Sequence, residues 1–120
     1  MIIDDFKIGK KSTYIIAEIG NNHNGDFDRA IQMIDDLISI DVNAVKFQKR
    51  DLTSVYTKKS LSRASQDLNV EYTLDLLRKF ELSKNHHQKL KKYCLQKNIT
   101  YLCTPWDIDS FHFLEKINVA

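Results

Sequence analysis

Four polar side chains lie near the ends of three short apolar segments of the sequence. Glu18 is near the end of the first segment, Lys46 and Gln48 are in the second, and Thr104 closes the third, just before Pro105. If the segments are strands, Lys46 and Gln48 point to the same face, because side chains alternate along a strand. A lysine and a glutamine that face inward together are costly unless something polar lies opposite them. The pattern therefore predicts a site for a polar ligand.

The stretch EIGNNHNG, residues 18–25, adds a turn to this site. It holds a carboxylate, three asparagines, a histidine and two of the three glycines of the chain. Glycine permits backbone conformations that other residues avoid, and asparagine side chains satisfy exposed backbone groups. We expect a tight turn beside the ligand, with Glu18, Lys46, Gln48 and Thr104 together on one rim.

Each of these residues also has a purely structural interpretation. Glu18 could pair with a surface lysine, and Lys46 could extend its ammonium group out of the sheet into solvent. Thr104 could simply end a strand, and His23 could be a turn residue with its hydrogen bonds satisfied within the turn. The combination of residues, more than any one of them, favours a site.

Alternating strands and helices are predicted to position these residues. Apolar and β-branched runs predict strands at 13–20, 43–48 and 99–104, the first of them covered on both faces. Three- and four-residue apolar spacing predicts a helix after the N-cap Asp26, and further helices at 72–82, 84–96 and 108–117, with Ser83 as a cap. This order is typical of an α/β fold with a parallel sheet. The polar segment 51–70 is predicted to be a functional loop.

Composition excludes several classes of protein. The 120 residues are 42% hydrophobic and 28% charged, as in an ordinary globular domain. The net charge of +2 comes from 18 basic and 16 acidic residues that are spread along the chain, so we expect no nucleic-acid partner. We expect the lysines of 89–97 to form a solvated helix face. No apolar run approaches a membrane span, and we expect a cytoplasmic protein in which Cys94 and Cys103 are free buried thiols.

Several motifs together resemble a known family. EIGNNHNG, VKFQ and CTPWD, followed by FLEKINVA, are similar to the N-terminal half of the sialic acid synthases, the NeuB-type enzymes that also make pseudaminic and legionaminic acids. The resemblance runs from about Tyr14 to the last residue and includes ELS at 81–83. CTPWD replaces the commoner TPF-D pattern. By this resemblance, residues 1–120 are the N-terminal portion of a (β/α)8 TIM barrel.

The resemblance implies a condensation of phosphoenolpyruvate with an N-acetylated aldose, which yields a nonulosonic acid and phosphate. Carried over residue by residue, Lys46 would contact the carboxylate of phosphoenolpyruvate and Thr104 its phosphate. Gln48 and Glu18 would contact the sugar, with Glu18 as the catalytic residue. Asn69 lies close to the place of a sugar-contacting asparagine, although Val70 could equally occupy it. The residue types suit these partners.

The resemblance also implies parts that this sequence does not contain. The family uses a divalent metal ion, Mn or Mg, as a Lewis acid, and none of the four histidines matches its ligands. The rest of the barrel and a C-terminal antifreeze-like domain would lie after Ala120, and the family works as a domain-swapped homodimer. We therefore expect the 120-residue chain alone to be inactive.

Two other functions remain open from the sequence. The first is a non-catalytic module that binds a sugar or phosphate, or that mediates an interaction. The second is a different barrel enzyme in which Lys46 forms a Schiff base with a carbonyl substrate, a reading that leaves the turn 18–25 without a role.

Overall fold

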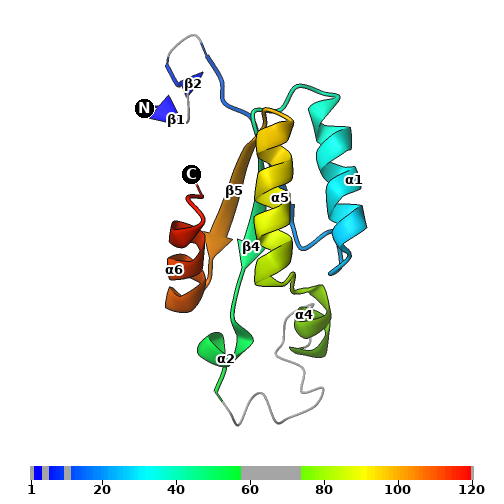
Figure 1. Cartoon of the computed structure of the whole chain (residues 1–120), viewed down its shortest axis with the longest axis vertical. Helices are drawn as coiled ribbons and strands as arrows, with labels where there is room; N and C mark the ends of the chain where they lie inside the picture. Colours follow the sequence, from blue (N-terminus) through cyan, green and yellow to red (C-terminus); the bar gives the residue numbers. More distant parts are fainter. Residues whose placement is uncertain (1, 4–5, 10–11, 58–73, 120) are drawn as a thin grey trace.

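Three parallel strands form the centre of the chain. The structure, a computed structural model, describes residues 2–3, 6–9, 12–57 and 74–119. Its main sheet has the order β3 (Ile16–Gly20), β4 (Ala44–Lys49) and β5 (Thr100–Pro105) (Figure 1). Strands that follow one another in the chain are thus neighbours in the sheet. The α/β fold predicted from the sequence is confirmed, and each predicted strand is present within a few residues of its expected bounds.

Two of the helices around these strands begin at caps that were predicted from the sequence. The helices are α1 (Phe27–Ile38), the short α2 (Leu52–Val55), α4 (Leu74–Phe80), α5 (Lys84–Gln96) and α6 (Ile108–Lys116). The side chain of Asp26 accepts a hydrogen bond from the backbone N–H of Arg29 at the start of α1, and that of Ser83 accepts one from His86 at the start of α5. Each cap satisfies a backbone donor that the helix leaves unpaired.

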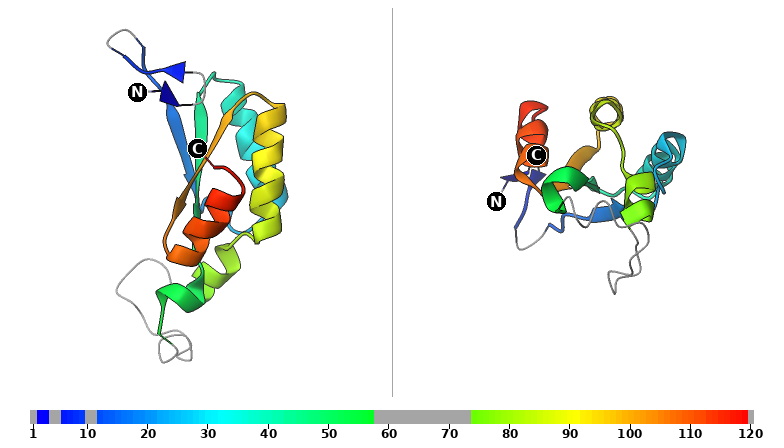
Figure 2. Two further views of the ribbon diagram at one scale, coloured as in Figure 1. Left: turned by 60° about the vertical axis from the view of Figure 1, so that its left-hand side comes forward. Right: turned by 90° about the horizontal axis from the view of Figure 1, so that it is seen from below.

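The helices α1, α5 and α6 cover one face of the sheet (Figure 2). The core lies between this face and the helices and is formed by buried side chains of both layers: Ile19, Ala30, Ile34, Val45, Phe47, Leu82, Leu90, Cys94, Ile99 and Tyr101. Figure 2 shows no described helix over the opposite face of the sheet, and Ile16 there is 44% exposed. The first strand was predicted to be covered on both faces, and for the described residues this prediction is wrong. A continuous apolar run suits a strand with a packing layer on each face, and the described helices provide a layer on one face only.

A small antiparallel hairpin precedes the sheet and was not predicted. It consists of β1 (Ile2–Ile3) and β2 (Phe6–Lys7), and Phe6 packs edge-on against Tyr14 with ring centroids 5.2 Å apart. Strands of two residues leave almost no alternation in the sequence, which is why no pattern pointed to them.

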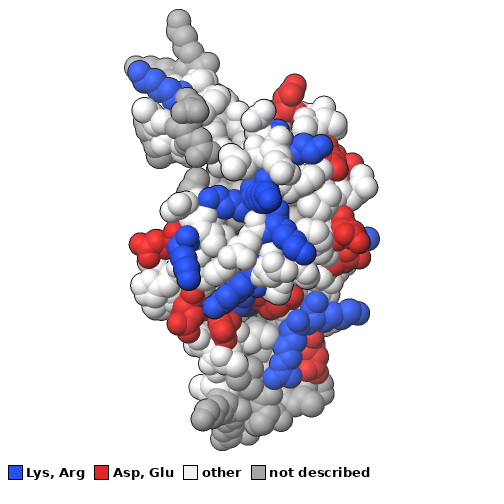
Figure 3. Space-filling view, viewed as in Figure 1, with Lys and Arg blue, Asp and Glu red and all other residues white. Residues whose placement is uncertain are grey.

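Charged side chains of both signs are interspersed on the surface. Figure 3 shows lysine and arginine next to aspartate and glutamate across the face that carries α5. Lys89 and Lys92 of this helix and Lys97, its C-cap, are exposed, as expected for a solvated helix face. Lys91 differs from this expectation, because it is half-buried and donates to the carbonyl of Ile117. None of the described helices has the length and apolar character that a membrane crossing needs.

Candidate functional site

The predicted polar residues of β3, β4 and β5 lie on the face of the sheet opposite the helices. Glu18 of β3 is in register with Lys46 of β4, and Gln48 of β4 is in register with Thr104 of β5. Val45 and Phe47, which alternate with Lys46 and Gln48 along β4, point to the other face and are buried in the core. Gln48 and Thr104 lie near the C-terminal ends of β4 and β5, where ligands bind in parallel sheets, and Glu18 and Lys46 lie near the middle of β3 and β4. The structure thus brings them together.

An ion pair links the first two of these residues. Nζ of Lys46 lies 2.7 Å from Oε2 of Glu18, and the two side chains are 35% and 45% exposed. The partner of Glu18 is thus the other candidate residue and not a surface lysine elsewhere. A pair with this much exposure contributes little to stability, about 1 kcal/mol or less. It holds both groups in place while leaving them open to a ligand.

Two side chains of the turn that follows β3 form hydrogen bonds with the backbone of the turn itself. Nδ2 of Asn22 donates to the carbonyl of Ile19 at 2.9 Å, and Nδ1 of His23 accepts from the backbone N–H of Gly25 at 3.0 Å. The His23 ring is buried and lies 5.9 Å from the ring of Phe47. Burial, the largest influence, lowers the pKa of His23. His23 is therefore a satisfied turn residue, the structural alternative noted from the sequence.

Glycine is needed at both ends of this turn. Gly20 and Gly25 have φ angles of 54° and 79°, in the left-handed region that disfavours other residues. A Cβ on Gly25 would overlap the backbone carbonyl of Lys79 in α4. A Cβ on Gly20 would lie 3.4 Å from Nε2 of Gln48 and 3.7 Å from Oε1 of Glu18. The turn therefore packs against α4 at one end and against the polar face at the other.

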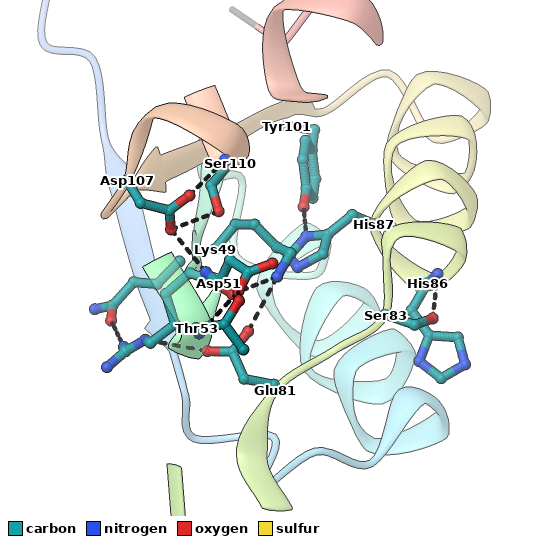
Figure 4. Close-up of polar contacts among 12 residues, drawn as sticks. Lys49, Asp51, Thr53, Glu81, Ser83, His86, His87, Tyr101, Asp107 and Ser110 are labelled. Carbon is teal, nitrogen blue, oxygen red and sulfur yellow. Dashed lines mark hydrogen bonds and ion pairs between the residues drawn. The ribbon is translucent and has the colours of Figure 1, made fainter. Parts of the chain in front are cut away.

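A buried ionic cluster at the end of β4 supports the polar face. Lys49 and Arg50 are both buried, and each pairs with Glu81. Nζ of Lys49 lies 3.3 Å from Oε2 (Figure 4), and Nε of Arg50 lies 3.1 Å from Oε1. Burial raises the pKa of Glu81, and the two cations counteract that effect. Two cations around one carboxylate avoid a buried charge without a partner. No pattern in the sequence predicted a role for Lys49 or Arg50.

The same cluster borders a buried histidine. His87 of α5 is fully buried, and its Nδ1 lies 2.7 Å from the hydroxyl of Tyr101 in β5 (Figure 4). Burial and, second to it, the charge of Lys49 lower the pKa of His87 to about 3. The imidazole is therefore neutral at physiological pH.

Burial also raises the pKa of the thiols of Cys94 and Cys103 to about 12, so neither is a reactive thiolate near pH 7.

Asp107 holds two loops together at the same end of the sheet. Its carboxylate caps α6 by accepting from the backbone N–H of Ser110 at 2.7 Å, and it accepts from the backbone N–H of Asp51 at 2.6 Å. Burial alone would raise the pKa of Asp107, but these hydrogen bonds lower it overall. Asp107 therefore joins the segment after β4 to the start of α6.

Two features predicted from the sequence, Asn69 and the functional loop, cannot be placed in the site. Asn69 and most of the predicted functional loop 51–70 lie outside the described residues. Among the residues that are described, no three or more histidine, cysteine, aspartate or glutamate side chains gather as a metal site would require. No metal ligand is therefore assigned in this part of the chain.

Comparison with known proteins identifies the family. The chain is 33% identical to N-acetylneuraminate-9-phosphate synthase of Drosophila melanogaster, over 99% of this chain and 33% of the fly protein. It is also 33% identical to N,N'-diacetyllegionaminic acid synthase of Campylobacter jejuni, over 91% of this chain and 34% of that protein. The chain thus spans about a third of the length of these relatives.

A solved structure agrees with these relatives. The crystal structure of N-acetylneuraminic acid synthetase from Leptospira borgpetersenii, in complex with citrate, matches with a TM-score of 0.81 and 29% identity, over 99% of this chain and 38% of that one. The sequence model of the NeuB family matches residues 7–120 of this chain. With its parallel strands, its polar strand ends and this match over nearly its whole length, the chain belongs to the NeuB family.

Proposed function

We propose that this protein condenses phosphoenolpyruvate with an acetamido aldose to form a nonulosonic acid and inorganic phosphate. One observation carries the proposal: a cation, a carboxylate, an amide and a hydroxyl lie together on the face of the sheet that none of the described helices covers, from the middle of β3 and β4 to the C-terminal ends of β4 and β5. Relatives named for the synthesis of sialic and legionaminic acids support it. Balance of the reaction requires one water molecule, whose oxygen remains in the products.

Each residue is given the partner that its chemistry suits. Lys46 binds the carboxylate of phosphoenolpyruvate, because an ammonium group forms charge-assisted hydrogen bonds with carboxylates. Thr104 donates its hydroxyl to the phosphate. Gln48 and Glu18 bind the sugar, and Glu18 faces the reacting groups. In the unliganded protein Glu18 neutralises Lys46 at 2.7 Å, so we expect binding of the substrate carboxylate to weaken this pair.

A divalent metal ion and a homodimer are further parts of the proposal. The metal would polarise the aldehyde, and the described residues contain no group of three or more histidine, cysteine, aspartate or glutamate side chains that could hold it. Asn69 remains a proposed sugar contact in the segment after β4.

Two alternatives predict different results. A non-catalytic module would bind phosphoenolpyruvate or the sugar without turnover. A Schiff-base enzyme would trap its substrate on Lys46 after borohydride reduction. Lysines that form Schiff bases are usually activated by an apolar pocket or a neighbouring cation, whereas the neighbour of Lys46 is a carboxylate. The geometry therefore favours electrostatic binding by Lys46.

The test is made on the product of the complete gene that encodes this sequence. Phosphate release is measured with phosphoenolpyruvate, Mn²⁺ and, in separate assays, N-acetylmannosamine, its 6-phosphate or a diacetamido hexose. We expect release that depends on one of these sugars. Lys46→Ala should weaken phosphoenolpyruvate capture by about 1.5 to 3 kcal/mol, with a much smaller effect on the aldose. Lys92→Ala, an exposed lysine of α5, is the control. An unchanged KM and kcat in Lys46→Ala would remove Lys46 from the site.

A further inference from the structure

Arg50 is a buried cation that makes three contacts at the end of β4. Its Nε pairs with Oε1 of Glu81 at 3.1 Å, and its Nη2 donates to Oε1 of Gln48 at 2.8 Å. The guanidinium carbon lies 4.5 Å from the centre of the Trp106 ring. Only 6% of the residue is exposed. A buried guanidinium is tolerated where its charge has partners, and these contacts supply a carboxylate, an amide oxygen and an aromatic face, although Nε itself makes no hydrogen bond.

The contact with Arg50 determines how Gln48 presents its amide. A guanidinium group has only donors, so the side-chain oxygen of Gln48 must be the atom that faces it. The amide nitrogen then points elsewhere. It lies on the side of Gly20, where a Cβ would be 3.4 Å from Nε2 of Gln48 and 3.7 Å from Oε1 of Glu18. Gln48 thus offers its N–H groups beside the Glu18–Lys46 pair.

We propose that Arg50 is a positioning residue that fixes Gln48 as a hydrogen-bond donor to the sugar substrate. Gln48 then favours a sugar that places an acceptor oxygen, from a hydroxyl or an acetamide carbonyl, next to the N–H groups of Gln48. The inference rests on the proposed function for the identity of the ligand, but the orientation of Gln48 is a property of the unliganded protein.

The shape of arginine explains why this position needs it. Its planar group forms an ion pair with Glu81 on the Nε side and donates a hydrogen bond to Gln48 through Nη2 at the same time, and its guanidinium carbon lies over the Trp106 ring. A lysine has one nitrogen and cannot make all three contacts. Lys49 lies beside Arg50 but points into the core side of the sheet, where it pairs with Glu81. Replacement of Arg50 by a neutral residue therefore leaves Glu81 with one cation, which favours a variant that still folds.

The first experiment measures Gln48 directly in the 120-residue chain. The side-chain amide of Gln48 is assigned by its loss in Gln48→Met, and its {1H}–15N heteronuclear NOE is compared with that of Gln96, which is exposed on α5. In the wild type we expect the heteronuclear NOE of the Gln48 side-chain amide to approach the values of the backbone amides. In Arg50→Met it should fall to the value of Gln96, and in Arg50→Lys it should be intermediate. An unchanged value in both variants would overturn the proposal.

The second experiment measures the consequence for the substrate, in the product of the complete gene. In Arg50→Met we expect KM for the aldose to rise roughly 10-fold, with KM for phosphoenolpyruvate within about twofold of the wild type. Arg50→Lys should recover part of this loss. Arg78→Met is the matched control, because Arg78 is exposed on α4 and pairs with Asp75. Equal rises in both KM values would contradict a role through Gln48.

The outcomes separate this inference from the proposed function. If the wild type condenses no aldose, the proposed function fails, while the amide measurement still decides whether Arg50 positions Gln48. If the wild type is active and Arg50→Met and Arg50→Lys keep the wild-type KM for the aldose, the inference fails and the function stands. If Arg50→Met does not fold, Arg50→Lys carries both measurements.

Discussion

We expect mild acid to destabilise this protein through His87. The imidazole is fully buried against Tyr101 of β5, and its environment includes Lys49 of β4, His23 of the first turn and its neighbour His86. Burial and these positive or titratable groups disfavour a proton on His87 and lower its pKa to about 3, against an ordinary value of 6.5. The folded protein therefore keeps His87 neutral at a pH where the unfolded chain protonates it.

The size of the effect follows from the two pKa values. Below pH 6.5 the unfolded state takes up a proton that the native state does not, so the free energy of unfolding falls as the pH falls, until about pH 3. The slope is about 1.4 kcal/mol per pH unit where the unfolded state is fully protonated. Because the unfolded His87 is still partly neutral between pH 7 and 6, the loss from pH 7 to pH 5 is about 2 kcal/mol.

Urea unfolding at a series of pH values measures this loss. His87→Gln removes the titrating group and keeps a polar atom for Tyr101, so its stability should fall about 2 kcal/mol less than that of the wild type between pH 7 and pH 5. The comparison uses the change with pH, so a general loss of stability in the variant does not affect it. His112→Gln, which replaces an exposed histidine of α6, should behave like the wild type. Parallel curves for the wild type and His87→Gln would refute the reasoning.

Three further outcomes test the turn, a helix cap and the candidate site. Gly25→Ala should lower the free energy of unfolding by about 3 kcal/mol, because its Cβ overlaps the carbonyl of Lys79 and its φ is positive, whereas Gly9→Ala has open space and should change it by less than about 0.5 kcal/mol. Ser83→Ala should cost about 1 kcal/mol in thermal or urea unfolding, and Ser83→Asp should recover most of it. In the product of the complete gene, Lys46→Ala should impair capture of phosphoenolpyruvate more than capture of the aldose, as measured by the two KM values.

Much of the fold could be predicted because it depends on local patterns. The helix at 84–96 has the predicted bounds, since its apolar spacing and the Ser83 cap are both encoded within the helix and its first neighbour. That Lys46 and Gln48 point to the same face of the sheet could be predicted because side chains alternate along a strand. This alternation does not depend on what the strand packs against. The hairpin at the N-terminus lacked such a pattern.

The support of the site could not be predicted in the same way. Lys49 and Arg50 are consecutive charged residues at the end of a strand, a pattern that ordinarily indicates exposure to solvent. They are buried because Glu81, more than 30 residues later in the chain, provides a carboxylate between them. The depressed pKa of His87 likewise depends on its place between β5 and the cluster. Contacts of this kind depend on tertiary packing, which no local pattern encodes.

The position of this cluster relates stability to the candidate function. The residues that face the proposed ligand are half-exposed, and a pair such as Glu18–Lys46 adds little stability. Directly behind them, Arg50 joins Gln48 to the buried charges of Glu81 and Lys49. A side chain that must meet a small substrate at a fixed distance needs such support, because a shift of about 1 Å is costly for binding and reaction. The buried charges at the end of β4 are therefore better explained by the orientation they give to Gln48 than by any stability they contribute, since buried ion pairs seldom stabilise a fold more than apolar residues would.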